Sequence, residues 1–241
     1  MSYNEMPILI TGASRGLGRA LAETFAQRGA RLALVARDRT RLDGVVASLR
    51  ARGAEAHALP ADIGDKRAIV PLAHSAAELV GPIELLIHNA SALGPNTLKL
   101  LMDTECEELE HAVAVNLIGP FRLSRIIAGA MAVRRRGTLV HVSSDAAVEP
   151  YARWGAYAAS KAAQDHLGRI WAQELAPFGV RSLSIDPGDM DTDLHAQALP
   201  DADRSTLAQP ATVAERIAQI LTDPRVPSGA RIVASRWEPP T

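Results

Sequence analysis

The eight residues TGASRGLG at 11–18 constrain the fold more than any other stretch of this sequence. An apolar run at 7–11 is typical of a buried strand, and a helical pattern follows the glycines over 19–28. A second apolar run at 31–36 indicates another strand. Strand, glycine-rich turn, helix and strand in this order form a βαβ unit, whose two strands are parallel. The stretch therefore predicts a dinucleotide-binding α/β fold.

The alternation of strand and helix continues to the end of the chain. Helices are expected over 39–52, 66–80, 105–132, 157–175 and 211–221, and strands over 56–59, 83–88, 138–143, 180–185 and 230–234. Such alternation predicts an α/β fold, a doubly wound parallel sheet (Rossmann fold) of about seven strands with helices on both faces. The 241 residues contain no linker, repeat or low-complexity tract, so we expect a single domain over 1–241.

Each glycine of the turn has a physical role. Gly12 permits a tight turn out of the strand, while Gly16 and Gly18 allow the backbone to approach a phosphate and the helix to approach the sheet. The N-terminus of the helix presents backbone N–H groups and the positive end of its dipole to a pyrophosphate. The GxxxGxG spacing differs from the common GxGxxG, but the elements around it favour nucleotide binding over a purely structural turn.

The end of the second expected strand bears on the choice between NAD and NADP. NAD sites offer an acidic residue there to the ribose hydroxyls, whereas NADP sites offer arginine to the 2′-phosphate. Here Ala36 precedes Arg37, and Arg15 in the turn can reach the same phosphate. Two charge-assisted hydrogen bonds of about 1.5–3 kcal/mol each favour NADP by roughly 100- to 10,000-fold. NADP(H) is therefore favoured, although solvated arginines or an inward Asp38 would favour NAD(H).

A tyrosine and a lysine stand four residues apart in YAASK at 157–161, on one face of the expected helix. A free phenol titrates near pH ~10. An ammonium group within a few ångströms stabilises the phenolate and lowers that pKa, so the tyrosine can exchange a proton at neutral pH. We expect Tyr157 to be a general acid–base whose pKa Lys161 lowers. Taken alone, the pentapeptide also fits an ordinary surface helix.

Further motifs follow along the chain in a fixed order. They are Asp62 after the third expected strand, HNAS at 88–91, VNLIG at 115–119, VSS at 142–144 and PGDMDT at 187–192. With the glycine turn and YAASK, they resemble the motifs of the classical short-chain dehydrogenases/reductases over almost the whole chain. The resemblance implies hydride transfer between a nicotinamide cofactor and a carbonyl or secondary alcohol.

The resemblance implies four catalytic residues: Asn116, Ser144, Tyr157 and Lys161. Tyr157 would transfer the proton, and Lys161 would lower its pKa and bind the nicotinamide ribose. Ser144 would hydrogen-bond the substrate carbonyl, whose developing charge needs a preorganised donor. Asn116 would hold a proton-relay water near the lysine. Ser143 competes for the serine role, although its spacing to the tyrosine favours Ser144.

The resemblance also implies which residues bind the cofactor. Asp62 and Ile63 would line the adenine site, Asn89 and Ala90 would lie beside the cofactor, and Thr192 would touch the nicotinamide carboxamide. The full expected set is Gly12, Ser14, Arg15, Gly16, Leu17, Gly18, Arg37, Asp62, Ile63, Asn89, Ala90, Tyr157, Lys161, Pro187, Gly188 and Thr192.

The chain departs from the family pattern in two places. The usual NNAG is HNAS at 88–91, a change expected to leave the catalytic set unaffected. The C-terminus finishes RWEPPT at 236–241 in place of a glycine-rich ending. That edge often meets a partner subunit in the family, and the helices at about 105–132 and 157–175 are those it buries between subunits. We therefore expect a homodimer or a homotetramer.

The substrate pocket is the least determined part of the site. The family builds a substrate lid over about 189–210, a segment that is polar here. The expected wall residues, Leu93, Tyr151, Trp154, Met190 and His195, suggest a partly aromatic cavity for a small or medium carbonyl compound. An NADP-dependent reductase is the main hypothesis, and an NAD-dependent alcohol dehydrogenase or a catalytically idle nucleotide-binding sensor are the alternatives. Enoyl reduction is disfavoured because relatives with that activity tend to place six residues between tyrosine and lysine, not three.

Composition argues against several other classes of function. The net charge is −1 with 22% charged residues, which gives no indication of nucleic-acid binding or an anionic membrane partner. The seven histidines and Cys106 show no metal-ligand spacing, so no metal is expected. We find no pattern of a signal peptide or membrane span, which makes the cytoplasm the expected location.

Overall fold

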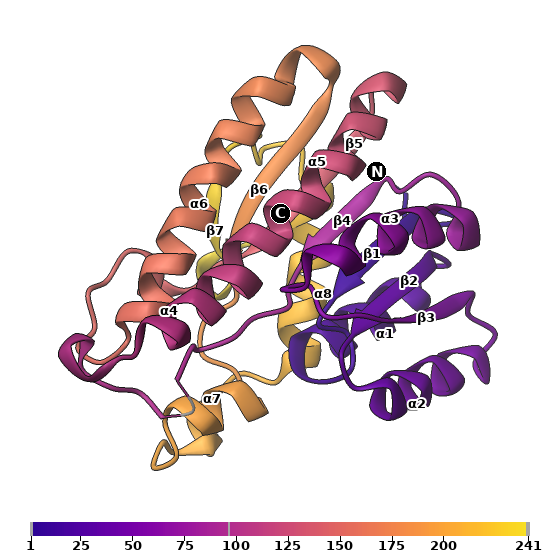
Figure 1. The fold of residues 1–241 in the computed structure, drawn as a ribbon. Coiled ribbons are helices and arrows are strands. Elements are labelled where there is room, and N and C mark those ends of the chain that lie inside the picture. Colours follow the sequence, from indigo (N-terminus) through magenta and orange to yellow (C-terminus); the bar gives the residue numbers. More distant parts are fainter. Residues whose placement is uncertain (1, 96, 240–241) are drawn as a thin grey trace.

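The computed structural model describes residues 2–95 and 97–239. Over these residues, seven parallel strands form one sheet in the order β3-β2-β1-β4-β5-β6-β7 (Figure 1). The strands are β1 (Pro7–Thr11), β2 (Arg31–Ala36), β3 (Ala56–Pro60), β4 (Leu85–His88), β5 (Gly137–Val142), β6 (Val180–Asp186) and β7 (Arg231–Val233). The strand order reverses between β1 and β4, which opens a crevice at the carboxyl ends of these strands. The expected doubly wound parallel sheet is confirmed.

Helices cover both faces of the sheet. They are α1 (Gly16–Ala26), α2 (Arg39–Arg50), α3 (Lys66–Val80), α4 (Cys106–Val113), α5 (Gly119–Arg134), α6 (Gly155–Leu175), α7 (Asp193–Ala198) and α8 (Pro210–Thr222). The apolar sides of α1, α2 and α8 pack on one face, and those of α3, α5 and α6 on the other. Burying each large apolar side chain contributes about 1.5–3 kcal/mol, so the two cores hold the helices on the sheet.

Three local features differ from the sequence expectations. Helix α1 begins at Gly16 and not at Arg19, so the last two glycines of the turn belong to its first turn. The helix expected over 105–132 contains a π-helical segment, η2 (Ala114–Ile118), which breaks the regular hydrogen-bond ladder around Asn116. The polar loop contains α7, because the Thr192 hydroxyl accepts a hydrogen bond from the His195 amide (3.2 Å) and caps this helix.

The carboxyl ends of β4, β5 and β6 carry a buried polar row on the α6 face of the sheet. His88 is in register with His141, and His141 with Ser184. All three side chains are buried, and the two imidazole rings are stacked with centroids 5.1 Å apart. Gly168 of α6 lies over this row, since a Cβ there would be 3.2 Å from the His141 ring. Polar residues therefore replace the apolar core directly behind the crevice.

The helical run from Cys106 to Arg134, comprising α4, η2 and α5, spans 29 residues. Its length and composition alone are compatible with a membrane crossing, but half of its most apolar window is buried inside the fold. Core helices satisfy the same criterion. The absence of a membrane partner thus stays a prediction.

Candidate active site

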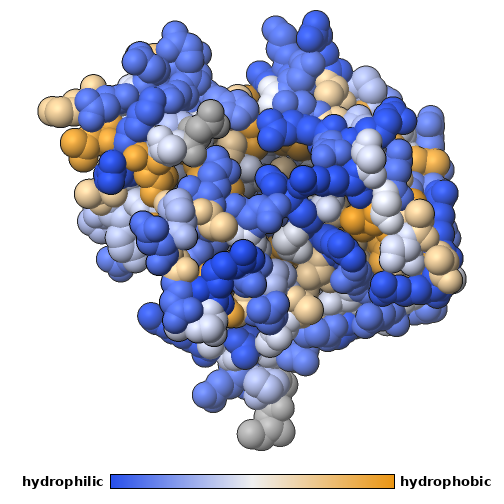
Figure 2. Space-filling view, turned by 90° about the horizontal axis from the view of Figure 1, so that it is seen from below, coloured by the Kyte–Doolittle hydropathy of each residue, from blue (hydrophilic) through white to orange (hydrophobic). Residues whose placement is uncertain are grey.

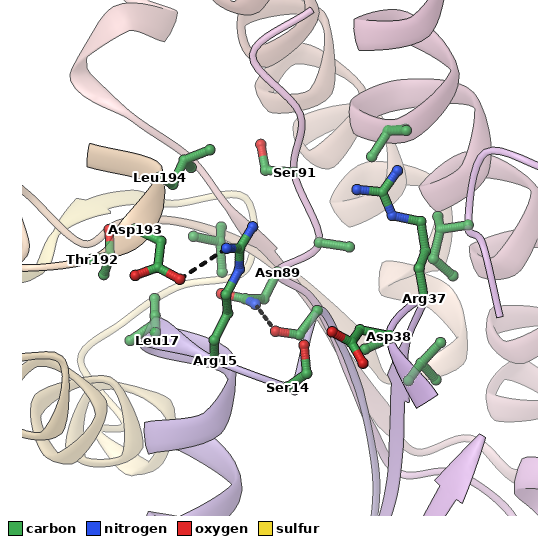
Figure 3. A pocket seen from close by; sticks show the side chains of 18 of the residues that line it. Ser14, Arg15, Leu17, Arg37, Asp38, Asn89, Ser91, Thr192, Asp193 and Leu194 are labelled. Atoms are coloured by element: carbon green, nitrogen blue, oxygen red, sulfur yellow. Dashed lines mark hydrogen bonds and ion pairs between the residues drawn. The ribbon is translucent and has the colours of Figure 1, made fainter. Parts of the chain in front are cut away.

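A cleft of about 630 Å³ opens where the strands end. Its lining comes from the glycine turn, the ends of β2 and β4, the start of α6 and the segment leading into α7. Figure 2 looks onto this edge of the molecule, where hydrophilic side chains predominate and apolar ones show between them. Figure 3 shows part of the lining at close range. The residues expected to bind the cofactor line this cleft, except Gly18 and Gly188.

The glycine turn is shaped by close backbone contacts. Gly12 has φ +71°, and a Cβ there would lie 2.8 Å from the Cα of Ala90. Gly18 lies against the Gly12 carbonyl, and the Asn89 amide donates to that carbonyl at 3.1 Å. A Cβ on Gly16 would be 3.3 Å from the Thr192 methyl group. No side chain caps the N-terminus of α1, so its first amides are available to an anionic ligand.

Charged side chains gather at one end of the cleft. Arg15 pairs with Asp193 of α7 (Nη1–Oδ2 2.8 Å), as Figure 3 shows, and Arg41 lies 3.9 Å from the same oxygen. Arg37 lies on the other side of the opening, 62% exposed and 4.0 Å from Asp62. The Asp38 carboxylate accepts a hydrogen bond from the Arg41 amide (3.0 Å) and so caps α2. Three arginines therefore border this end.

Lys161 lies at the opposite end and is only 1% exposed. Its Nζ donates to the Val142 carbonyl at 2.7 Å and lies 3.4 Å from Oε1 of Gln164. The same Nζ is 5.7 Å from the centre of the Tyr157 ring. Burial lowers the pKa of Lys161 to about 8, against the opposing charges of Asp165 and Asp186. The helical spacing thus brings tyrosine and lysine together, as expected.

The expected lowering of the Tyr157 pKa is wrong. Burial raises the pKa of this phenol to about 12, and hydrogen bonds with Ser144 and Ser91 offset only part of that rise. The negative charges of Asp145 and Asp186 raise the pKa further. The sequence pattern places Lys161 near Tyr157, but it does not determine how far the ring is removed from water. Here this desolvation has the largest effect on the pKa of Tyr157. Tyr157 therefore holds its proton firmly at neutral pH.

The structure distinguishes the two candidate serines. The Ser143 hydroxyl points into the protein and donates to Asp165 Oδ2 at 2.6 Å. The Ser144 hydroxyl bonds with Tyr157, donates to Asp145 (2.9 Å) and accepts from the Ala146 amide (3.2 Å). The Ser144 hydroxyl therefore lies beside the Tyr157 hydroxyl, whereas the Ser143 hydroxyl is bound to the buried Asp165.

Asn116 holds the segment after β4 in place. Its Oδ1 accepts from the Ala92 amide (2.8 Å) and from the Ser91 hydroxyl (3.1 Å), while its Nδ2 donates to the Ala92 carbonyl (2.8 Å) and to Ser160 (2.9 Å). Ser91, which stands where the family has glycine, also bonds with Tyr157, so this departure places a hydroxyl against two of the residues expected to be catalytic. Whether the catalytic set is affected stays a prediction.

The expected substrate residues fall into three groups. Leu93 and Trp154 pack around Tyr157, and the two aromatic rings meet edge to face at 5.7 Å. Met190 lines the cleft directly. Tyr151 is half exposed and donates to Asp145 at 2.8 Å, and His195 lies 3.9 Å from Asp189. Only Met190 of the five therefore lies in the cleft lining.

Several lining residues were not anticipated from the sequence. They are Arg41, Ser91, Val115, Val142, Asp193 and Leu194, besides the backbone neighbours of expected residues. Arg41 had a detectable signal, because it lies one helical turn after Arg37 at the start of an expected helix. No signal in the sequence indicated Asp193, because its position depends on the course of the loop before α7. Among the described residues, no group of three or more His, Cys, Asp or Glu side chains forms a metal site.

The chain is similar to known proteins over most of its length. The family model described as short chain dehydrogenase matches residues 7–203. The 2,3-dihydro-2,3-dihydroxybenzoate dehydrogenase of Bacillus subtilis is 39% identical over 185 residues, covering 77% of this chain and 70% of that protein. The 3-oxoacyl-[acyl-carrier-protein] reductase FabG of Escherichia coli is 32% identical over 205 residues, covering 85% and 81%.

Solved structures give the same result. A short-chain dehydrogenase from Burkholderia cenocepacia in complex with NADP has a TM-score of 0.84 at 26% identity and covers 97% of each chain. A 3-ketoacyl-(acyl-carrier-protein) reductase from Brucella melitensis complexed with NADH has a TM-score of 0.87 at 25% identity, covering 96% of this chain and 97% of that one. The chain belongs to the short-chain dehydrogenase family. It is an NAD(P)-dependent oxidoreductase that acts on small molecules.

Proposed function

We propose that this protein is a cytoplasmic, NADP-dependent carbonyl reductase in which Tyr157 is the general acid. The observation that carries the cofactor choice is the arginine-lined end of the cleft, where Arg15, Arg37 and Arg41 surround the position expected for a ribose 2′-phosphate. Asp38 is the acidic residue that would favour NAD, and its carboxylate is engaged at the start of α2. The three arginines pair with exposed carboxylates and can exchange them for a 2′-phosphate, which favours the more anionic cofactor.

The residues present fit a nicotinamide dinucleotide. The close approach of Gly12, Gly16 and Gly18 to their neighbours leaves backbone amides facing the cleft, as a pyrophosphate requires. When bound, the nicotinamide supplies the hydride. Lys161 would hold the ribose, Thr192 would contact the carboxamide, and Pro187 would complete the wall of the cleft, while Gly188 fixes the turn through its hydrogen bond to Asp186.

The proton chemistry supports reduction as the working direction. Tyr157 keeps its proton at neutral pH, so it can donate that proton to the oxygen of a carbonyl as negative charge develops there. The Ser144 hydroxyl, which donates to Asp145 in this structure, would provide a second donor to the same oxygen by rotating about its Cβ–Oγ bond. The catalytic set we propose is thus Tyr157, Ser144 and Lys161, with Asn116 fixing the segment that carries Ser91.

The walls around Tyr157 favour a small or medium substrate with an apolar or aromatic body. Leu93, Trp154 and Leu194 pack beside the tyrosine, and Met190 lines the adjoining part of the cleft. The two relatives are named for 2,3-dihydro-2,3-dihydroxybenzoate and for 3-oxoacyl-[acyl-carrier-protein]. Cyclic ketones and β-keto esters are therefore the first compounds to test.

The direct test is NADPH oxidation with a panel of cyclohexanones, ethyl acetoacetate and acetoacetyl-coenzyme A. Wild type should turn over at least one of them, and Tyr157→Phe should lose roughly 100- to 10,000-fold in kcat while NADPH binding is retained. Binding of NADPH without turnover of any carbonyl, or turnover that Tyr157→Phe leaves intact, would contradict the proposal. The first of these results would favour the nucleotide-binding sensor.

We also propose that the protein forms a homodimer or homotetramer through α5 and α6. Large apolar side chains are exposed on these helices, with Phe121 36% and Ile170 39% exposed, and the Phe121 ring lies 6.0 Å from that of Trp171. Such exposed apolar groups on neighbouring helices are typical of an interface. Light scattering on wild type and Ile170→Arg tests this, with a smaller species expected for the variant.

A further inference from the structure

Arg231 on β7 lies far from the catalytic residues in sequence but touches three segments of the active site. Its Nη2 donates to the Ser144 carbonyl at 2.8 Å and lies 3.0 Å from Asp186 Oδ2. Its Nε lies 3.0 Å from Asp165 Oδ2. The two carboxylate side chains are only 8% and 4% exposed, and the arginine side chain is 22% exposed. One guanidinium therefore joins the ends of β5 and β6 to α6.

Both carboxylates also bind groups of the active-site walls. Asp165 Oδ2 accepts the Ser143 hydroxyl at 2.6 Å, which fixes the residue next to the catalytic serine. Asp186 Oδ1 accepts the Gly188 amide at 2.9 Å, which fixes the turn that follows β6. Asp165 Oδ1 is buried and has no hydrogen-bond partner among the described residues, so its negative charge is balanced mainly by Arg231.

The same two carboxylates act on the catalytic lysine. Asp165 and Asp186 are the groups whose charges favour the protonated form of Lys161 against its burial. The other titratable groups that face this region are Tyr157 on α6, His141 on β5 and His88 on β4, and both imidazoles are buried and neutral at pH 7. Arg231 is thus the cation that shares these carboxylates with Lys161.

We propose that Arg231 is a positioning residue for the active site: it holds the Ser144 backbone and engages Asp165 and Asp186, so that they do not bind Lys161 more tightly. This proposal rests on the proposed catalytic roles of Ser144 and Lys161. Arg231 is not among the residues that line the cleft, so its side chain does not reach the reacting atoms. Its effect is carried by the serine carbonyl and by the two carboxylates.

The sequence allows a direct measurement on the lysine. The chain has three lysines, Lys66, Lys99 and Lys161, so protein labelled with 15N- or 13C-lysine gives three side-chain signals. Lys66 is exposed, Lys99 pairs with Glu108 at 2.7 Å, and Lys161 is buried, so their titrations are distinguishable by NMR. This readout needs no substrate.

In Arg231→Met, the Lys161 titration should move to higher pH by about half a pH unit or more, because both carboxylates lose their other cation. In Asp165→Asn it should move to lower pH. With the most active carbonyl of the panel, Arg231→Met should lower kcat about tenfold or more and leave the KM for NADPH within about twofold. Arg231→Gln should show the same two effects without adding a lysine signal, and it provides the same measurement if the methionine variant does not fold.

Arg181→Met is the matched control, since Arg181 on the neighbouring strand β6 donates, among the described residues, to the carbonyls of Leu221 and Val226 and to no carboxylate. It should leave the Lys161 titration and kcat as in wild type. An unchanged Lys161 titration in both Arg231 variants, or a kcat within twofold of wild type in both, would overturn the proposal. Loss of turnover in Tyr157→Phe identifies this as a failure of the Arg231 inference alone. If Tyr157→Phe is fully active, the proposed function fails instead.

Discussion

The charged side chains at the two ends of the cleft differ in their exposure to solvent and in how they are paired. At the end bordered by Arg15, Arg37 and Arg41, the charged side chains are 43–62% exposed, and these arginines pair with Asp193, Asp62 and Asp38 respectively. At the catalytic end Lys161 is buried, and every charge near it has a fixed partner. Exposed pairs contribute about 0–1 kcal/mol and exchange readily for a ligand anion. Buried groups instead change each other's pKa.

This difference separates two kinds of residue. Substitutions at the exposed end should change which cofactor binds and leave folding intact. Substitutions at the buried end should change proton transfer, stability or both. The four tests below examine that division, from the largest expected effect to the smallest.

The serine pair should give the largest contrast. Ser144→Ala should lower kcat by about 100- to 1000-fold, because it removes a donor to the developing oxyanion, while the unfolding free energy changes little. Ser143→Ala should mainly lower the unfolding free energy, by about 1–3 kcal/mol, since it leaves the buried Asp165 without its hydroxyl donor. Steady-state kinetics and urea unfolding on both variants measure this. Equal losses of kcat in the two variants would contradict the assignment of Ser144, and not Ser143, as the donor to the oxyanion.

His141 should make the protein sensitive to acid. Burial lowers the pKa of His141 to about 4, with Asp165 opposing and Lys161 adding to that shift. An unfolded histidine binds its proton near pH 6.5, so the stability linked to this group is present above that pH and is lost as the pH falls toward 4. The loss from pH 7 to pH 5 is about 2 kcal/mol.

Urea unfolding at pH 7 and pH 5 should therefore show a smaller loss for His141→Asn than for wild type. The exposed His74→Gln is the control for removing an imidazole from the surface. A wild-type loss that His141→Asn leaves unchanged would show that other buried groups, such as His88, determine the acid sensitivity.

Ser91→Gly restores the family residue and should have a moderate effect. Removing a hydrogen bond that lowers the pKa of Tyr157 should raise that pKa further and lower kcat by about tenfold, which corresponds to about 1.4 kcal/mol. Ser91→Ala should behave in the same way, which separates the lost hydroxyl from added backbone freedom. A pH–rate profile measures both, and a shift seen only for glycine would assign the effect to the backbone.

Asp193→Asn should have the smallest effect. This carboxylate pairs with Arg15 and would compete with a phosphate for it. Its removal should tighten NADPH binding by about two- to fivefold, the range of an exposed ion pair, and leave NADH binding nearly unchanged. Isothermal titration with both cofactors checks this. Weaker NADPH binding would instead indicate that Asp193 helps to close α7 over the cofactor.

The division between the two ends also marks how far the sequence could predict the site. The glycine turn, Arg37 and YAASK are local patterns, so their places followed from periodicity and spacing. Ser143, Asp165 and Arg231 meet only because β5, β6 and β7 lie side by side under α6, and no short-range pattern connects them. The raised pKa of Tyr157 depends on desolvation, which is a property of the packed structure.

The most direct test of the proposed cofactor is a pair of titrations, NADPH and NADH, followed by nicotinamide fluorescence. They are made on wild type, on Arg37→Ala and on Arg39→Ala, an exposed arginine outside the cleft lining that serves as the matched control. We predict that NADPH binds at least about tenfold more tightly than NADH, that Arg37→Ala loses this preference and that Arg39→Ala keeps it. Equal or tighter binding of NADH to wild type would contradict the assignment and would favour an NAD-dependent alcohol dehydrogenase.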